Sequence, residues 1–119
     1  MKYQHARCCF CSEMVWMSVL GLRIKQARMR VGLSQERLGL EAGLDAMSAS
    51  TRMNRYELGK RIPTPDFVER LGVVLNTPAA YFYCVDEEEA ELLIKFHRLD
   101  ASRRAQLLQA LDALLDLDL

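Results

Sequence analysis

Residues 32–61 read GLSQERLGLEAGLDAMSASTRMNRYELGKR, and the pattern of this stretch is the clearest indication of the fold. Ser34 is a favourable N-cap for a helix over 35–42, and Gly43 ends that helix. A second helix, polar on one side, follows and ends near Leu58. Its apolar side is formed by two residues at helical spacing, Met53 and Tyr56. The stretch therefore predicts two short helices joined by a turn.

Further helices are predicted on both sides of this pair. Before it, a helix over 18–31 presents an apolar face made of Leu20, Ile24, Ala27 and Val31. After it, Thr64 and Pro65 open a helix that ends at Asn76, and Thr77 with Pro78 repeat the signal for a short helix to Cys84. Two more helices are predicted over 86–98 and 99–116. No stretch alternates as a strand does, so the sequence predicts an all-α fold.

Length and composition indicate an ordinary globular chain. It has 119 residues, half of them apolar and 27% charged, and no apolar run approaches the roughly 20 residues that span a bilayer. We expect a cytoplasmic protein without a membrane partner. The net charge is zero, yet residues 1–70 carry 12 Lys or Arg against 7 Asp or Glu, whereas residues 71–119 carry 4 against 9. A basic front half suits the phosphates of nucleic acid, although charges scattered over solvated faces would also explain it.

Three cysteines are clustered at the N-terminus. Cys8, Cys9 and Cys11 lie close to His5, so a metal site is conceivable, but paired C-x-x-C spacing is missing. We therefore interpret residues 1–16 as a disordered, reduced tail and expect no metal and no cofactor. His5 and His97 are the two imidazoles, and neither is surrounded by a nucleophile or a phosphate loop, so we expect no enzyme.

The predicted helix pair suits the major groove of DNA, which is wide enough for an α-helix. The chain resembles the Cro and phage-repressor helix-turn-helix family, also called the xenobiotic-response-element type. The resemblance rests on motifs that occur in order, namely LGLRI at 20–24, Arg28, GLSQE at 32–36, Leu38, RYELGKR at 55–61, Pro63, and residues 71–82.

The resemblance implies a five-helix DNA-binding domain over 17–84, followed by a helical extension over 85–119 that is a candidate for dimerisation. It assigns base contacts to the recognition helix, at Ser50, Thr51 and Arg55, flanked by Arg52 and Asn54. It assigns phosphate contacts to Gln35, Lys60 and Arg61, with Gln35 also bracing the recognition helix. Arg28 and Glu57 correspond to an internal ion pair.

The chain departs from the family pattern in the turn. About four extra residues fall within 45–50, so the start of the recognition helix stays open between a cap at Ser48 and a cap at Asp45. In the second case Met47 and Ser48 would also reach the groove. Gly39 and Gly72 stand where the family prefers alanine, and because both residue types are small we expect packing to tolerate either.

The expected function is sequence-specific regulation of transcription, most simply as a repressor. The leucines of the last helix favour a homodimer that reads a palindromic operator in double-stranded DNA; they are Leu107, Leu108, Leu111, Leu114 and Leu115. The alternative is an antitoxin or a protein-interaction module on the same scaffold, which would bind a protein partner such as a toxin.

Overall fold

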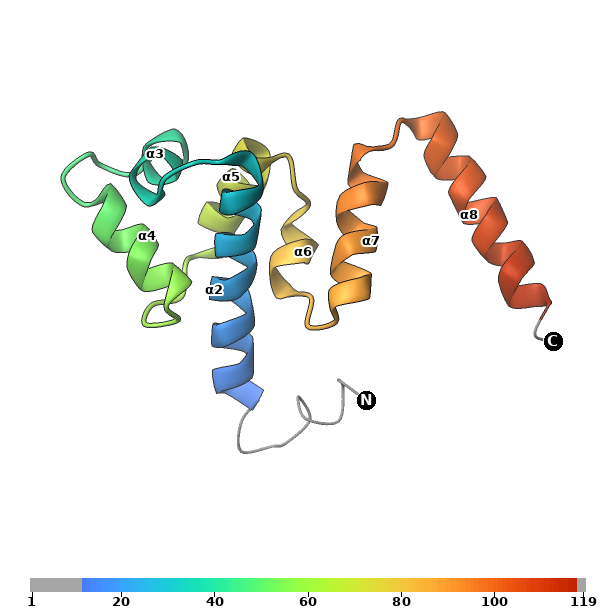
Figure 1. The fold of residues 1–119 in the computed structure, drawn as a ribbon, viewed down its shortest axis with the longest axis horizontal. Helices are drawn as coiled ribbons and strands as arrows, with labels where there is room; N and C mark the ends of the chain where they lie inside the picture. The colour runs from blue at the N-terminus through green and yellow to red at the C-terminus, as the bar shows by residue number, and fades with distance from the viewer. Residues whose placement is uncertain (1–11, 118–119) are drawn as a thin grey trace.

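The computed structural model describes the backbone of residues 12–117 and the side chains from residue 19 onward. Across this part of the chain every regular element is helical, as predicted, and Figure 1 shows the arrangement. In chain order the seven helices are α2 (Ser12–Val31), α3 (Gln35–Glu41), α4 (Ala49–Glu57), α5 (Pro65–Leu75), α6 (Ala79–Tyr83), α7 (Glu87–Arg98) and α8 (Ala101–Asp116).

Helix α2 begins earlier than predicted. It starts at Ser12, so residues 12–16 of the segment assigned to the disordered tail are helical. No proline or glycine occurs between Ser12 and Leu20, and a helix extends cheaply into such a stretch. The prediction for Val31 was also wrong, because this side chain is 47% exposed and the apolar face ends at Ala27. The cysteine cluster lies outside the described residues.

Helices α3 and α4 pack closely at one end of the molecule (Figure 1). Gly39 makes the approach possible. A Cβ at this position would lie 3.0 Å from Ala49 Cβ and 3.0 Å from Met53 Cγ. Since an added methyl group here would need the neighbouring helix to move, the small residue fixes how near the two helices lie.

The structure shows where the helix after the long turn begins, a point that the sequence left open. Helix α4 begins at Ala49, with Ser48 at the N-cap position, although the Ser48 side chain makes no capping hydrogen bond. Asp45 stabilises the preceding turn instead, because its carboxylate accepts a hydrogen bond of 3.1 Å from the backbone N–H of Met47. Residues 45–48 therefore belong to the turn and not to the helix.

The caps of α5 are as predicted, but the assignment of Thr77 was wrong. Thr64 Oγ1 accepts from Phe67 N–H at the start of α5, and Asn76 closes it in the left-handed conformation with φ 50°. The Thr77 hydroxyl is buried and donates to Leu75 O, so it does not cap α6. Gly72 is also more constrained than expected: a Cβ there would lie 2.6 Å from Thr77 O, which leaves no room for alanine.

One hydrophobic core joins α2 to α7. Its largest fully buried side chains come from five helices, and they are Tyr81, Phe82, Ile24, Leu38, Met53, Leu71, Leu75 and Val68. Helix α7 joins this core through Ala90 and Ile94. Helix α8 does not join it, since none of its described residues is buried.

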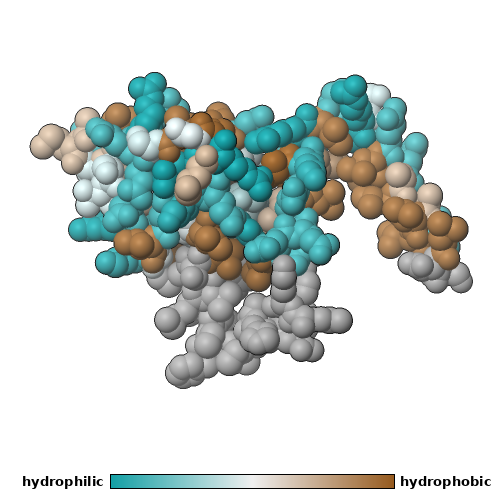
Figure 2. Space-filling model, in the orientation of Figure 1, coloured by the Kyte–Doolittle hydropathy of each residue, from teal (hydrophilic) through white to brown (hydrophobic). Residues whose placement is uncertain are grey.

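Helix α8 stands apart from the rest of the molecule in Figure 1. Arg104 ties its first turns to α7, donating to Phe96 O at 3.0 Å and to His97 O and lying 5.1 Å from the Phe96 ring centroid. Further along, Leu108, Leu114 and Leu115 are exposed, at 51%, 61% and 66%, whereas Leu107 and Leu111 are half-buried. Figure 2 shows a hydrophobic strip along α8. Within the part of the chain that the structure describes, no hydrophobic core covers this strip.

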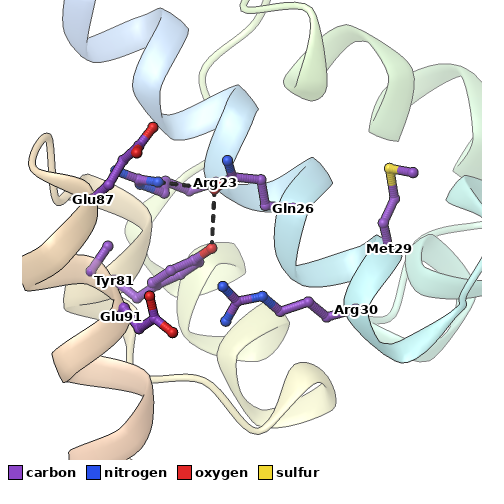
Figure 3. Close-up of a pocket in the computed structure, with 8 residues that line it drawn as sticks. Arg23, Gln26, Met29, Arg30, Tyr81, Glu87 and Glu91 are labelled. Carbon is purple, nitrogen blue, oxygen red and sulfur yellow. Dashed lines mark hydrogen bonds between the residues drawn. The ribbon is translucent and has the colours of Figure 1, made fainter.

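Figure 3 shows Arg23 beside Gln26 and Tyr81 in a pocket. Its hydrogen bonds hold α2 to the link between α6 and α7. This guanidinium is 4% exposed and donates to Cys84 O at 2.9 Å, to Val85 O at 3.1 Å and to Gln26 Oε1 at 2.9 Å. Tyr81 Oη lies 3.3 Å from the same Gln26 oxygen, and burial raises the pKa of the Tyr81 phenol. These side chains line an open pocket of about 520 Å³ between the three helices.

Candidate nucleic-acid interface

Helix α4 has one buried face and one exposed face. Ala49, Met53 and Tyr56 recur at helical spacing and are buried. Four of the five residues predicted to contact bases are exposed, and these are Ser50, Thr51, Asn54 and Arg55. The apolar residues bind α4 to the body of the domain, so the polar residues of the same helix are presented to solvent as one surface.

Arg52 is the predicted base contact that the structure does not bring to this surface. It is half-buried, and its guanidinium donates to Tyr56 Oη at 3.0 Å. Its Nε is buried and has no hydrogen-bond partner among the described residues. Successive residues of an α-helix are 100° apart around its axis. Arg52 therefore lies beside Ala49 and Tyr56, at the edge of the buried face. Helical spacing alone could have indicated this.

An ion pair fixes the far end of α4 to α2. Arg28 Nε lies 2.7 Å from Glu57 Oε2, and Arg28 Nη2 lies 3.1 Å from Glu57 Oε1. The two side chains are 14% and 3% exposed, so this bidentate pair is largely shielded from water. Arg28 also donates to Leu33 O at 2.8 Å. The predicted partners thus connect α2, the link that leads into α3, and the end of α4.

Gly21 contributes to the same junction and was missed as a functional position. A Cβ on Gly21 would lie 2.5 Å from Glu57 O and 2.7 Å from Tyr56 O. Helix α2 can therefore touch the backbone of α4 only because this residue has no side chain. Gly21 belongs to one of the motifs that carry the family resemblance, so a signal was present in the sequence. A glycine inside a predicted helix does not, however, indicate which other segment that helix contacts.

Gln35 lies between the ion pair and the exposed surface. Its Nε2 donates to Asn54 Oδ1 at 3.2 Å and to Glu57 Oε1 at 3.2 Å. An amide nitrogen carries two hydrogens, and both are engaged here. In this conformation the Gln35 side chain therefore has no donor left for a phosphate oxygen. The geometry supports its predicted bracing role and does not support the predicted phosphate contact.

Lys60 and Arg61 follow directly after α4. Gly59, with φ 74°, turns the chain, and Lys60 N–H donates to Arg55 O at 3.0 Å. Both basic side chains are exposed, and neither forms a hydrogen bond or ion pair with another described residue. They stand beyond the helix, next to the surface that Arg55 presents, so three cations lie at this end of α4.

The donors of this site suit an anionic, hydrogen-bonding polymer. The site presents arginine, lysine, amide and hydroxyl donors, and among the described residues no group of three or more His, Cys, Asp or Glu side chains is placed to hold a metal ion. No helix in that part of the chain is long and apolar enough to cross a membrane.

Comparisons with known proteins agree with this geometry. The family model of the helix-turn-helix domain matches residues 19–82, just over half of the chain. The crystal structure of the transcriptional regulator BswR is similar, with 42% sequence identity and a TM-score of 0.76, over 81% of this chain and 95% of that one. A search of curated protein sequences found no significant match. The chain belongs to the helix-turn-helix domain family, and it is a DNA-binding regulator by that membership.

Proposed function

We propose that the protein binds double-stranded DNA sequence-specifically by placing α4 in the major groove. The observation that carries this proposal is the exposed polar face of α4, which is rigidly attached to the body by a buried face and by the Arg28–Glu57 ion pair. Arg55 and Thr51 are the proposed base-reading residues at its centre, with Ser50 and Asn54 beside them. Arginine pairs bidentately with guanine, and hydroxyls accept or donate to several bases.

Lys60 and Arg61 are the proposed phosphate contacts. They lie outside the helix, where base edges are out of reach and the sugar-phosphate backbone passes. Their side chains form no hydrogen bond or ion pair with another described residue, so no such contact has to break when they bind a phosphate. Contacts of this kind add affinity for any sequence and make binding dependent on salt. Gln35 is proposed to hold the recognition helix and not to contact phosphate.

We further propose that two copies associate through α8 and read a palindromic operator, which would place their recognition helices about 34 Å apart. The support is the exposed leucine strip of α8, whose described residues bury nothing in their own chain. Arg103 lies at the start of α8, where it forms an exposed ion pair of 3.5 Å with Asp100, whereas Asp112 and Asp116 lie toward the end of the helix. An antiparallel pairing therefore brings opposite charges near each other. We also propose that the protein represses transcription at this operator and that it acts in the cytoplasm.

The same strip favours a second candidate function. A different protein, such as a toxin, could cover α8, in which case the chain would be an antitoxin or an interaction module. Both readings keep the helix-turn-helix domain, and they differ in what covers the leucines.

Selection from a pool of random 30-base-pair duplexes tests the proposed function. Purified protein should enrich a palindromic sequence, and a gel shift on the enriched duplex should show two protein chains bound. Enrichment of no sequence, together with equal and weak binding to all duplexes, would contradict sequence-specific regulation. Enrichment of a single, non-repeated half-site would contradict the dimer alone.

A further inference from the structure

The last helix is tied to the rest of the molecule through one side chain. Helix α8 follows α7 after a short link, Leu99 and Asp100, and none of its described residues is buried. Figure 1 shows the two helices diverging from this link. Among the described residues, Arg104 is the one member of α8 whose side chain forms a hydrogen bond with another helix. The direction of α8 therefore depends on Arg104 and not on a shared core.

Arg104 binds the end of α7 through a group whose shape fixes an angle. Its Nε donates to Phe96 O at 3.0 Å, and its Nη2 donates to His97 O at 2.6 Å. The last carbonyls of a helix lack their regular partners, and a cation is favourable beside them. The guanidinium is planar and its Cζ lies 5.1 Å from the Phe96 ring centroid. Two bonds from one plane to two carbonyls therefore define an orientation as well as a distance.

A small change in this angle becomes large at the far end of α8. The helix has 16 residues and is about 24 Å long, so a swing of about 10° displaces its end by about 4 Å. One added base pair moves a DNA half-site by about 3.4 Å along the duplex and by about 35° around it. In a dimer that pairs through α8, the angle at the link therefore governs which separation of half-sites both recognition helices can reach.

We infer that Arg104 selects the spacing between the two half-sites of the operator. It is a positioning residue that does not touch DNA, since α8 and α4 lie at opposite ends of the molecule (Figure 1). The inference rests on the proposed function, in which two copies pair through α8. When two binding modules are held in one geometry, the second binds as if it were highly concentrated, but only where the sites match that geometry. Without Arg104, α8 can swing about the link, and this advantage spreads over several spacings.

The neighbouring arginine provides a matched control. Arg103 has the same charge and lies in the same turn of α8, but its partner, at 3.5 Å, is Asp100 within the link, and this pair is exposed. In the described part of the chain Arg103 bonds to no residue of α7. Arg103→Ala therefore removes the same charge and leaves both contacts with α7 in place. Arg104→Lys keeps the charge but replaces the planar group by an ammonium that rotates freely and fixes no plane.

The experiment measures how affinity depends on half-site spacing, with the full-length wild-type protein and these three variants. The palindrome enriched from random duplexes is kept, and its spacer is shortened and lengthened by one base pair at a time. The wild type and Arg103→Ala should bind one spacer about tenfold or more tightly than its neighbours. Arg104→Ala should bind the same spacers within about threefold of one another, and Arg104→Lys should lie between these results. All four proteins should bind a duplex with a single half-site equally.

The inference is overturned if the wild type binds all spacers alike, if Arg104→Ala keeps the wild-type preference or weakens every spacer equally, or if Arg103→Ala flattens the preference as strongly. Weak binding of Arg104→Ala to the single half-site would show damage to the DNA-binding domain, and Arg104→Lys then decides by the same criteria. A wild-type protein that enriches no sequence, or only a single half-site, would contradict the proposed function or its dimer, and the inference would fall with it.

Discussion

The body of the molecule and its last helix use apolar residues in opposite ways. In α2 to α6 the apolar residues at helical spacing are buried against one another, and Leu38 and Met53 have no exposed surface. In α8 the same spacing produces a strip that remains exposed, with Leu114 61% exposed. Helical periodicity therefore predicts which face is apolar but not what covers it. The body is stabilised within one chain, whereas α8 is suited to a partner.

Truncating one leucine in each region tests whether the two regions differ in how their leucines contribute to stability. Leu38→Ala should lower the free energy of unfolding by about 2–5 kcal/mol, because it leaves a cavity in a closed core. Leu114→Ala should change the unfolding of the monomer by less than about 0.5 kcal/mol, because this side chain is already in water. Urea unfolding at low protein concentration measures both. Equal losses would show that α8 belongs to the core.

The ion pair that holds α4 should contribute almost as much as a core residue. Glu57→Ala leaves Arg28 buried without its partner, and we expect a loss of about 3 kcal/mol in the free energy of unfolding. Glu41→Ala is the matched control, since the Arg37–Glu41 pair is exposed and should contribute less than about 0.5 kcal/mol. If the two variants unfold alike, the pair does not fix α4 to α2.

The leucine strip should govern association and not folding. Leu111→Ser combined with Leu115→Ser should raise the dimer dissociation constant more than about tenfold, because polar groups replace buried apolar area. Val73→Ser, at a side chain that is 82% exposed on α5, should leave association unchanged. Sedimentation equilibrium at micromolar concentrations measures both. A wild-type protein that stays monomeric with and without DNA would contradict the dimer.

The smallest expected effect concerns the junction of α2, α6 and α7. Burial raises the pKa of Tyr81 in the folded state above the value near 10 of an unfolded chain. The unfolded state therefore loses its proton first, and stability should fall as pH rises above about 10. Urea midpoints between pH 9 and 11 should fall less steeply for Tyr81→Phe than for the wild type. A parallel fall in both would assign the pH dependence to other groups.

Much of this architecture could be predicted from sequence because caps and periodicity are local. Thr64 and Asn76 bound the helix that they were expected to bound, and the all-α class follows from the absence of alternation. The unpredicted features depend on contacts between distant segments. Gly21 faces the backbone of α4, and Arg23 bonds to carbonyls 61 and 62 residues away, so no local pattern marks either role.

The site shows the same division. The exposed face of α4 follows from spacing, yet the engagement of both Gln35 hydrogens depends on where Asn54 and Glu57 meet in space. The longer turn before α4 could be recognised in the sequence. The sequence did not show whether Asp45 would stabilise this turn or cap the helix, and in the structure it stabilises the turn.

We propose a division of roles in which the exposed face of α4 reads bases and the residues beyond it contact the sugar-phosphate backbone of DNA. Affinities of Arg55→Ala and Lys60→Ala, measured on the selected duplex and on a scrambled duplex over several salt concentrations, test it most directly. Arg55→Ala should lose about 1–3 kcal/mol of binding free energy on the selected duplex and little on the scrambled one. Lys60→Ala should weaken both equally and lower the salt slope by about one unit per bound subunit. Equal weakening of both duplexes by Arg55→Ala, with a changed base preference in Lys60→Ala, would contradict the account.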